Sequence, residues 1–216
     1  MQQTIAREEP QTADGSFSPR QAEVLDATLR ELVAGGHALT MTAVARRASC
    51  SKETLYKWFG DREGLLRATV AYQAARVHVA SVEAGGLDLG SLQARLEEFA
   101  ANWLRVISSD TSIALNRVAI AEAGGGEAHL GGIVLEKGRF ALGARLKIIL
   151  EAGRQAGLLS FDDPEEAFRT FFGLFARDVQ IRLLLGDGLA LTPEIIRSDA
   201  ARAARQFLAL YGAATQ

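Results

Sequence analysis

Apolar residues recur about every 3.6 positions along almost the whole chain, and this spacing constrains the fold more than any other feature. Such a period is typical of amphipathic helices, in which residues three and four apart lie on the same face. No segment shows the strict alternation of apolar and polar residues that indicates a half-buried strand. With 216 residues, 48% of them apolar, the chain can bury the core of one large domain or two modest ones. The sequence therefore predicts an all-α protein.

Capping residues divide this pattern into about nine helices. The first begins with Ser18-Pro19, where Gln21 can reach back to the backbone of Ser18, and it ends at Gly35-Gly36. Further capping residues precede six later helices: Thr40, Ser51, Asp61, Ser91, Asp163 and Thr192. The helices are expected over about residues 18–35, 40–47, 51–59, 61–81, 91–106, 111–123, 133–156, 164–186 and from 193 onward.

A glycine-containing break, EAGGLDLGS, follows the fourth helix and is the best candidate for a domain boundary. We expect a flexible polar tail over residues 1–17, a first helical domain over 18–78 and a second over 79–216. The tail lacks the layout of a secretory signal, and the longest stretch without a charged residue, Leu32 to Ala45, is too short to span a bilayer. The single cysteine, Cys50, fits a reducing compartment. These features predict a cytoplasmic protein without a membrane partner.

The net charge of −2 is unevenly distributed along the chain. Residues 18–67 carry eight basic and six acidic side chains, whereas the segments before and after them are each acidic by two charges. Between Arg46 and Arg67 the excess is larger, with six basic side chains against three acidic ones. A local basic excess is the electrostatic footprint of a nucleic-acid partner when its side chains share one face.

The short helix expected over residues 51–59 has two chemically distinct faces. A helical wheel puts three apolar side chains in one inward sector: Leu55, Trp58 and Phe59. The opposite side carries polar side chains: Lys52, Glu53, Tyr56 and Lys57, with Thr54 at its margin. Such a helix fits the major groove of B-DNA, which is about 12 Å wide and presents base edges and phosphates to outward side chains.

The preceding helix, over residues 40–47, completes a recognisable motif. It turns Val44 and Ala45 inward and offers its N-terminal amides and threonine hydroxyls to a phosphate. Two short helices joined by a tight turn in this way predict a helix-turn-helix.

The stretch LTMTAVARRASCSKETLYKWFGDREGLL resembles the DNA-binding segment of the TetR family of transcriptional regulators, and the resemblance covers about residues 18–78. The matching positions are Thr40, Val44-Ala45, Ala48-Ser49-Cys50, Ser51, Thr54-Leu55-Tyr56, Trp58-Phe59 and Arg62-Glu63-Gly64-Leu65. The family usually carries glycine at the position of Ser49, where the turn requires a left-handed backbone that costs serine roughly 1 kcal/mol. Cys50 stands in place of valine, as a small hydrophobe between helices, unless an exposed thiol of low pKa makes it a redox switch.

The resemblance implies a DNA-binding role for nine residues. Those expected to approach bases are Lys52, Thr54 and Glu53. Those expected to hold phosphates are Tyr56, Lys57, Thr40, Thr42 and Arg62. Ser51, which caps the short helix, completes the set.

The helices expected near the C-terminus carry more apolar surface than one chain's core requires. Residues 164–186 are apolar on two sectors, one of which can face a second copy of the chain. Two helices from each chain would then form a four-helix interface, and a single thick core is the alternative. The interface is expected to contain Phe171, Leu174, Ile181, Leu185, Ile196, Ala200, Ala203 and Phe207.

Two further stretches, NRVAIAEAG and GLLSFDDPEEAFRTFFGLFARDVQIRLLLG, resemble the C-terminal domain of the AefR-like TetR subgroup. Where that subgroup often continues with Arg-Phe-Pro, this chain has Gly124-Gly125-Gly126. The resemblance implies an effector cavity among the fourth to eighth helices. The residue types nominate Phe99, Trp103, Asn116, Arg117 and Phe172 as its lining, with Arg117 or Glu122 as polar anchor. Core packing of the aromatic side chains and a structural Arg117–Glu122 ion pair are the alternatives.

Together these features predict a repressor that binds a palindromic operator as a homodimer and is released by a small hydrophobic or amphipathic effector. A related regulator without a small-molecule ligand is the first alternative. An all-helical enzyme is disfavoured, because the H-E-x-x-H, G-x-x-x-x-G-K-[ST] and G-x-S-x-G patterns are missing. His37, His78 and His129 have no cysteine or carboxylate at metal-binding spacing, so neither a metal nor a cofactor is expected.

Overall fold

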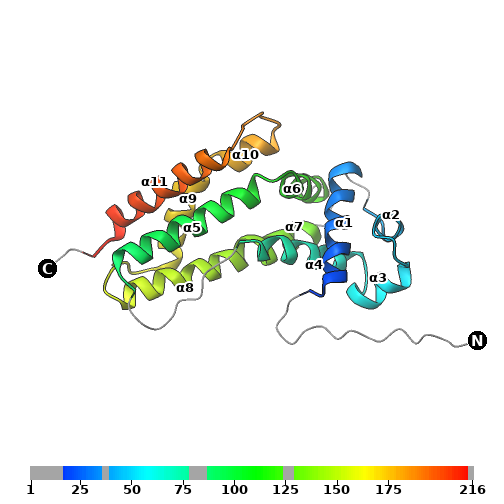
Figure 1. The fold of residues 1–216 in the computed structure, drawn as a ribbon, viewed down its shortest axis with the longest axis horizontal. Coiled ribbons are helices and arrows are strands. Elements are labelled where there is room, and N and C mark those ends of the chain that lie inside the picture. The colour runs from blue at the N-terminus through cyan, green and yellow to red at the C-terminus, as the bar shows by residue number, and fades with distance from the viewer. Residues whose placement is uncertain (1–16, 36–38, 78–86, 124–128, 214–216) are drawn as a thin grey trace, which may run out of the picture.

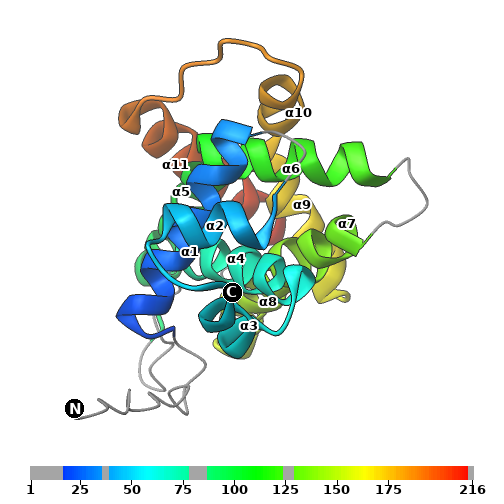
Figure 2. The ribbon, with the colours of Figure 1, turned by 90° about the vertical axis from the view of Figure 1, so that its right-hand side faces the viewer.

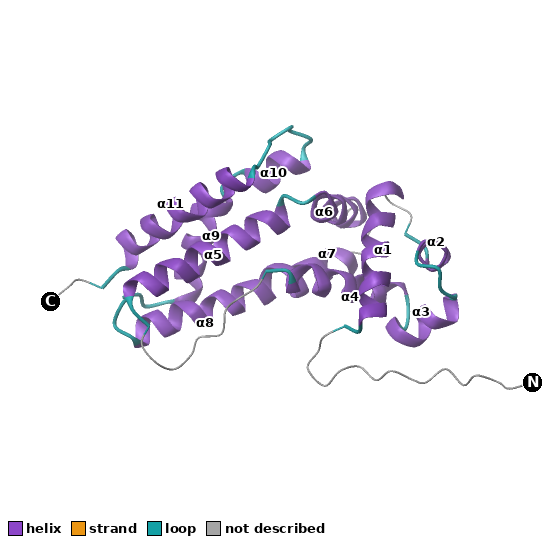
Figure 3. Cartoon of the chain, in the orientation of Figure 1, coloured by secondary structure: helices purple, strands orange, loops and turns teal. Residues whose placement is uncertain are grey.

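The computed structural model describes residues 17–35, 39–77, 87–123 and 129–213. These residues are helical without a strand, as Figure 3 shows, apart from one isolated bridge between Leu159 and Gly212. The expected all-α fold is therefore confirmed. The helices are α1 (Pro19–Gly35), α2 (Met41–Arg47), α3 (Lys52–Phe59), α4 (Arg62–Ala75), α5 (Leu89–Ile107), α6 (Asp110–Ala123), α7 (His129–Ile133), the π-helix η1 (Val134–Phe140), α8 (Ala141–Gln155), α9 (Pro164–Ala176), α10 (Val179–Leu184) and α11 (Pro193–Tyr211).

Most helices begin at the capping residues that the sequence indicates. The hydroxyls of Thr40 and Ser51 and the carboxylate of Asp61 each accept a hydrogen bond from the first turn of the helix that follows. One prediction was wrong: α5 begins with Asp88 as its N-cap rather than with Ser91. The Ser91 hydroxyl instead accepts a hydrogen bond from the Asp88 amide and completes a capping box.

Three predicted helices also have different bounds. The seventh, expected over 133–156, begins at His129 and continues through α7, η1 and α8 to Gln155. The fourth helix ends at Ala75 rather than near residue 81. The eighth, expected over 164–186, is broken into α9 and α10 at Arg177, whose backbone has a φ of 41°. A hydrophobic period cannot reveal such a break, because Arg177 is held there by an ion pair with Asp199 on α11. With the continuous run α7–η1–α8 taken as one helix, the described residues form ten helices.

The helices form two apolar clusters along an elongated molecule (Figure 1). The first cluster joins α1 to α4 with side chains from α6 and α7, among them Leu115 and Ile133. The second joins α5, α8, α9 and α11. Helices α2 and α3 lie at one end of the molecule, and Figure 2 looks at this end. The expected domain division at residues 78 and 79 stays a prediction, since residues 78–86 lie outside the described ones.

Candidate DNA-binding surface and ligand cavity

The turn between α2 and α3 keeps a left-handed residue although serine stands where glycine is usual. Ser49 has a φ of 51°. The guanidinium of Arg20 on α1 donates hydrogen bonds to the carbonyl oxygens of Ala48 and Ser49, at 2.9 and 3.1 Å. The amide of Cys50 donates to the carbonyl oxygen of Ala45 at 3.0 Å. These contacts fix the angle at which α3 leaves α2.

The two faces of α3 are those that the helical wheel predicts. Leu55 is fully buried, and Trp58 and Phe59 pack partly buried against the first apolar cluster. The side chains on the other face are exposed: Lys52, Glu53, Tyr56 and Lys57. Thr54 lies at the margin, and its hydroxyl lies 3.1 Å from that of Ser51. This division confirms that the polar side chains of α3 face outward, away from the core.

Neighbouring groups extend this polar surface. Thr40 and Thr42 at the start of α2 are exposed, and the Thr40 hydroxyl accepts a hydrogen bond from the amide of Ala43 at 3.1 Å. The pKa of Glu53 is lowered because its own backbone amide and the Ser51 hydroxyl donate hydrogen bonds to its carboxylate. Glu53 is therefore an anion at neutral pH and can only accept hydrogen bonds, as from a cytosine amino group.

Arg62, expected to hold a phosphate, has partners inside the chain. Its Nε donates to the carbonyl oxygen of Leu39 at 3.1 Å, and its Nη2 lies 2.8 Å from Oε1 of Glu122. Glu122, nominated as a cavity anchor, thereby connects the end of α6 to the start of α4. Both side chains are therefore engaged within the chain, and the phosphate contact expected of Arg62 stays a prediction.

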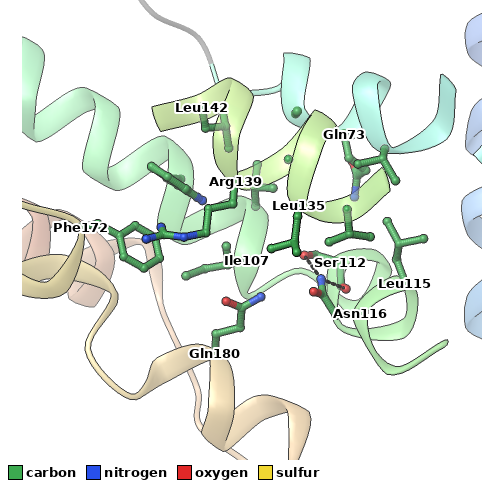
Figure 4. Close-up of a pocket in the computed structure, with 16 residues that line it drawn as sticks. Gln73, Ile107, Ser112, Leu115, Asn116, Leu135, Arg139, Leu142, Phe172 and Gln180 are labelled. Carbon is green, nitrogen blue, oxygen red and sulfur yellow. Dashed lines mark hydrogen bonds between the residues drawn. The ribbon is translucent and has the colours of Figure 1, made fainter. Parts of the chain in front are cut away.

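A cavity of about 160 Å³ lies where seven helical segments meet (Figure 4). Helix α4 contributes Val70, Gln73 and Ala74, and α5 contributes Trp103, Val106 and Ile107. Helix α6 contributes Ser112, Leu115 and Asn116, and η1 contributes Val134, Leu135, Gly138 and Arg139. Leu142 of α8, Phe172 of α9 and Gln180 of α10 complete the lining. The lining is mainly apolar, with a few polar groups facing the same space, which is the usual construction of a small-molecule site.

Three of the six nominated ligand-binding residues line this cavity: Trp103, Asn116 and Phe172. The other three do not. Phe99 is buried beside Trp103, with the ring centroids 5.6 Å apart. Arg117 donates hydrogen bonds to the carbonyl oxygens of Leu183 and Leu184 at the end of α10. Glu122 pairs with Arg62 and not with Arg117, so the alternative of an Arg117–Glu122 ion pair is wrong.

Sequence reasoning missed four polar lining residues: Gln73, Ser112, Arg139 and Gln180. Gln73 interrupts the apolar face of α4 between Val70 and Val77, and this interruption is the one signal that the sequence offers. Arg139 lies on η1, a π-helix whose i to i+5 hydrogen bonding gives a wider turn than an α-helix has. Such π-turns frequently occur at functional sites.

Arg139 is the most unusual group of the lining. Its guanidinium lies 4.3 Å above the ring of Phe172 and 5.1 Å above that of Phe168. Its Nη1 is buried and has no hydrogen-bond partner among the described residues. Burial lowers the pKa of Arg139, because desolvation disfavours the charged form. Oε1 of Gln73 is likewise buried and unpaired within the described part of the chain.

Most of the residues expected at a dimer interface are buried within a single chain. Five of them belong to the second apolar cluster: Phe171, Ile196, Ala200, Ala203 and Phe207. The rings of Phe171 and Phe207 pack against each other with centroids 5.1 Å apart. These five side chains are therefore buried in the core of one chain in this arrangement, so the proposed interface leaves them out, and their role between two chains stays a prediction. Leu174 is half-buried, while Ile181 and Leu185 are 54% and 81% exposed.

The remaining candidate residues show no further site. Cys50 is half-buried, and burial raises the pKa of its thiol. His37 and His78, the side chain of His129 and the Gly124–Gly126 run lie outside the described residues. No three histidine, cysteine or carboxylate side chains gather at a metal-binding distance in the part of the chain that is described. None of the described helices is long and apolar enough to cross a membrane.

Comparisons with known proteins match both parts of the chain. Residues 24–69 match the family model of bacterial regulatory proteins of the tetR family, and residues 94–213 match the AefR-like transcriptional repressor C-terminal domain. A TetR transcriptional regulator from Agrobacterium tumefaciens is 44% identical, with a TM-score of 0.79, covering 92% of this chain and 97% of that one. The flavonoid-responsive regulator FrrA is 27% identical, with a TM-score of 0.66, covering 91% and 98%.

A curated relative matches over a shorter range. The HTH-type transcriptional regulator BetI of Burkholderia thailandensis is 43% identical over 54 residues, which are 24% of this chain and 28% of that protein. The C-terminal match alone spans more than half of the chain and the Agrobacterium structure matches it almost from end to end. The chain therefore belongs to the TetR family of DNA-binding transcriptional regulators and carries an AefR-like C-terminal domain.

Proposed function

We propose that this protein is a repressor that binds a palindromic operator as a homodimer and releases it when a small molecule fills the cavity. One observation carries the proposal: α4 contacts both the cavity and the pair of helices α2 and α3, which we call the reading head. Its Leu65 and Leu66 pack in the first apolar cluster with α3, and its Val70 and Gln73 line the cavity. A ligand that favours one position of α4 therefore also favours one position of α3.

The proposed DNA contacts are the exposed side chains of α3 and the start of α2. Lys52, Glu53 and Thr54 would approach base edges in the major groove. Tyr56, Lys57, Thr40 and Thr42 would hold phosphates, and Ser51 would hold α3 in register through its cap. Arg62 is left out of the proposed contacts because its guanidinium already has two partners in the chain.

The cavity supports a ligand-responsive regulator over one without a ligand. A solid second domain would have favoured control by protein partners or by abundance. The cavity is instead mostly apolar and has a few polar groups in its lining. The name of FrrA states that this relative, which matches over 91% of the chain, responds to flavonoids.

The proposed dimer interface is smaller than the sequence analysis expected. It uses the outward side chains of α9 and α10, with Leu174, Ile181 and Leu185 at its centre. A two-fold pair of chains must place the two α3 helices on successive major-groove faces, roughly 34–36 Å apart or at a related spacing.

DNA binding is tested on the region upstream of the protein's own gene. Lys57→Ala and Tyr56→Phe should each weaken binding of this DNA in a fluorescence anisotropy titration, because each variant removes a donor to a phosphate. Lys147→Ala is the matched control, since Lys147 lies on α8 and pairs with Glu165. If both α3 variants bind as tightly as the parent protein, the proposed contacts are wrong.

The dimer is tested by sedimentation. The double substitution of Ile181 and Leu185 by aspartate should shift the protein to monomer and weaken operator binding with it. Ile148→Asp changes another largely exposed apolar residue, on α8, and should leave the mass of the dimer unchanged. A double variant that remains a dimer would place the interface elsewhere.

A further inference from the structure

The cavity holds two polar groups whose hydrogen-bonding capacity is unused. Nη1 of Arg139 and Oε1 of Gln73 are buried, and neither finds a partner among the described residues. Both side chains line the cavity. Buried polar groups in folded proteins are almost always paired, because an unpaired one lowers stability. Because both side chains line the same cavity, a ligand that filled it would meet both groups.

The unpaired guanidinium nitrogen of Arg139 favours an anionic group as its partner. A guanidinium stays protonated in proteins and has only donors, so its partner must accept hydrogen bonds. Phe172 and Phe168 cover its face through cation–π contacts, which leave its edge for an acceptor. The nearby carboxylate of Glu165 is already bound by Lys147 at 2.8 Å and by Arg169 at 3.1 Å. A carboxylate is the usual anion that matches the fork of an arginine.

The unpaired Oε1 of Gln73 requires a hydrogen-bond donor as its partner. Gln73 is 5% exposed, and its Nε2 donates to the hydroxyl of Thr111 at 2.5 Å. With its amide nitrogen engaged in this way, Oε1 remains to accept a hydrogen bond from inside the cavity. In the view of Figure 4, Arg139 lies against Phe172 on one side of the cavity and Gln73 lies on the other. The two requirements therefore apply to opposite ends of a ligand.

The space between these ends accommodates one ring. The lining there is apolar, with Ile107, Leu115 and Leu142, and Trp103 and Phe172 supply aromatic surface. The volume of about 160 Å³ is close to that of an engineered apolar cavity of about 150 Å³ that binds benzene. A fused or multi-ring molecule would need the cavity to enlarge.

We propose that the effector is a monocyclic aromatic carboxylate, with its carboxylate on Arg139 and a ring hydroxyl donating to Gln73. This inference rests on the proposed function, because it names the ligand class of the same cavity. A larger neutral polyphenol is the competing class, and the test separates the two.

The test compares acids with their neutral counterparts on the full-length protein. The probes are 4-hydroxybenzoate and 4-hydroxyphenylacetate, and the methyl ester and primary amide of each. Isothermal titration calorimetry should show the acids binding at least tenfold more tightly than the esters or amides. Arg139→Gln should weaken binding of the acids roughly 10- to 150-fold, the range that loss of a charge-assisted hydrogen bond produces, and should leave the esters nearly unaffected.

Two controls keep the result specific. Arg169→Gln removes a neighbouring positive charge that does not line the cavity, and it should retain the affinity for acids. Gln73→Met should abolish the preference for 4-hydroxybenzoate over benzoate while the affinity for benzoate remains. Circular dichroism melts of each variant exclude loss of fold as the cause.

Three results would overturn the inference. They are equal affinity for acids and neutral esters, unchanged acid binding by Arg139→Gln, and no binding of either acid up to 5 mM, a ceiling set at roughly the weak end of specific affinities. The proposed function fails separately. If the acids bind through Arg139 but operator affinity does not change, the proposed ligand class is supported and the proposed release of the operator by an effector is contradicted. If only a neutral polyphenol releases the operator, the proposed release by an effector is supported and the proposed ligand class is contradicted.

Discussion

At the scale of single residues, Ser49 carries a backbone strain that glycine would relieve. Its φ of 51° lies in the left-handed region, which costs a residue with a Cβ roughly 1–2 kcal/mol. Ser49→Gly should therefore raise the free energy of unfolding by about 0.5–1 kcal/mol, the difference between this strain and the greater chain entropy of glycine. Urea denaturation measures the change.

Ser108→Gly is the matched control for that substitution. Ser108 has a φ of −91°, which any residue adopts, so glycine brings no relief there. This variant should lose about 1–2.5 kcal/mol of stability, from the greater chain entropy of glycine together with the lost hydrogen bond from the Ser108 hydroxyl to the carbonyl oxygen of Leu104. A Ser49→Gly variant that loses stability in the same way would show that the turn is not strained.

Cys50 is expected to be an unreactive packing residue rather than a switch. Burial raises the pKa of its thiol, although the charge of Arg20 opposes this. The thiolate fraction at pH 7 is therefore below that of an ordinary cysteine, so alkylation by iodoacetamide should be slower than that of a free cysteine at pH 7 and should accelerate as the pH rises. Cys50→Val should bind the operator equally well under oxidising and reducing conditions. Loss of a redox response on this substitution would support a switch.

Residue-level features of the reading head could be predicted from the sequence, because they depend on neighbours in the chain. The caps Thr40 and Ser51 and the inward side of Leu55 follow from local spacing. The partners of Arg62 and Arg139 could not be predicted in this way. These partners lie between 23 and 60 residues away from the arginines along the chain, and no periodicity specifies such tertiary contacts.

At the scale of helices, the break between α9 and α10 depends on a buried carboxylate. The side chain of Asp199 on α11 is 10% exposed and pairs with Arg177, at the break, and with Arg202. Asp199→Asn should lower the free energy of unfolding by about 1.5–3 kcal/mol, because charge-assisted hydrogen bonds are lost in a buried place. Thermal and urea denaturation both measure this loss.

The control for Asp199 is an ion pair on the same helix. Glu194 and Arg197 are both largely exposed and lie 3.0 Å apart. Glu194→Gln should change stability by less than about 1 kcal/mol, as for other surface pairs. An Asp199→Asn variant as stable as this control would mean that packing alone, and not the charge, holds the break.

The same helices show why the sequence predicted the elements better than their ends. The eighth predicted helix has an unbroken apolar period through Arg177. The break there coincides with the ion pair between Arg177 and Asp199 of α11, a contact that the sequence pattern does not reveal. The assignment of α11 residues to a dimer interface also depended on periodicity alone. A stripe such as Ile196, Ala203 and Phe207 is apolar whether it faces its own core or a second chain, and burial decides between the two.

At the scale of the whole molecule, α4 and α6 join the reading head to the cavity. Helix α6 supplies Ser112 and Asn116 to the cavity, and Glu122 in its last turn pairs with Arg62 at the start of α4. Helix α4 in turn ends at the cavity with Gln73 and Ala74. The two family matches, to residues 24–69 and 94–213, thus fall on parts that share packed helices, which a division of the sequence into two domains does not convey.

The salt dependence of operator binding tests this arrangement as a whole. Each phosphate contact contributes about 0.9 to the slope of log affinity against log salt concentration. Lys57→Ala should therefore reduce the slope by about 1.8 if two chains read the two half-sites, and by about 0.9 if only one chain does. Arg62→Gln should leave the slope unchanged, since its charge is engaged by Glu122 and not by DNA. A slope reduced equally by Arg62→Gln would mean that Arg62 leaves Glu122 for a phosphate, so that DNA binding itself breaks the contact between α4 and α6.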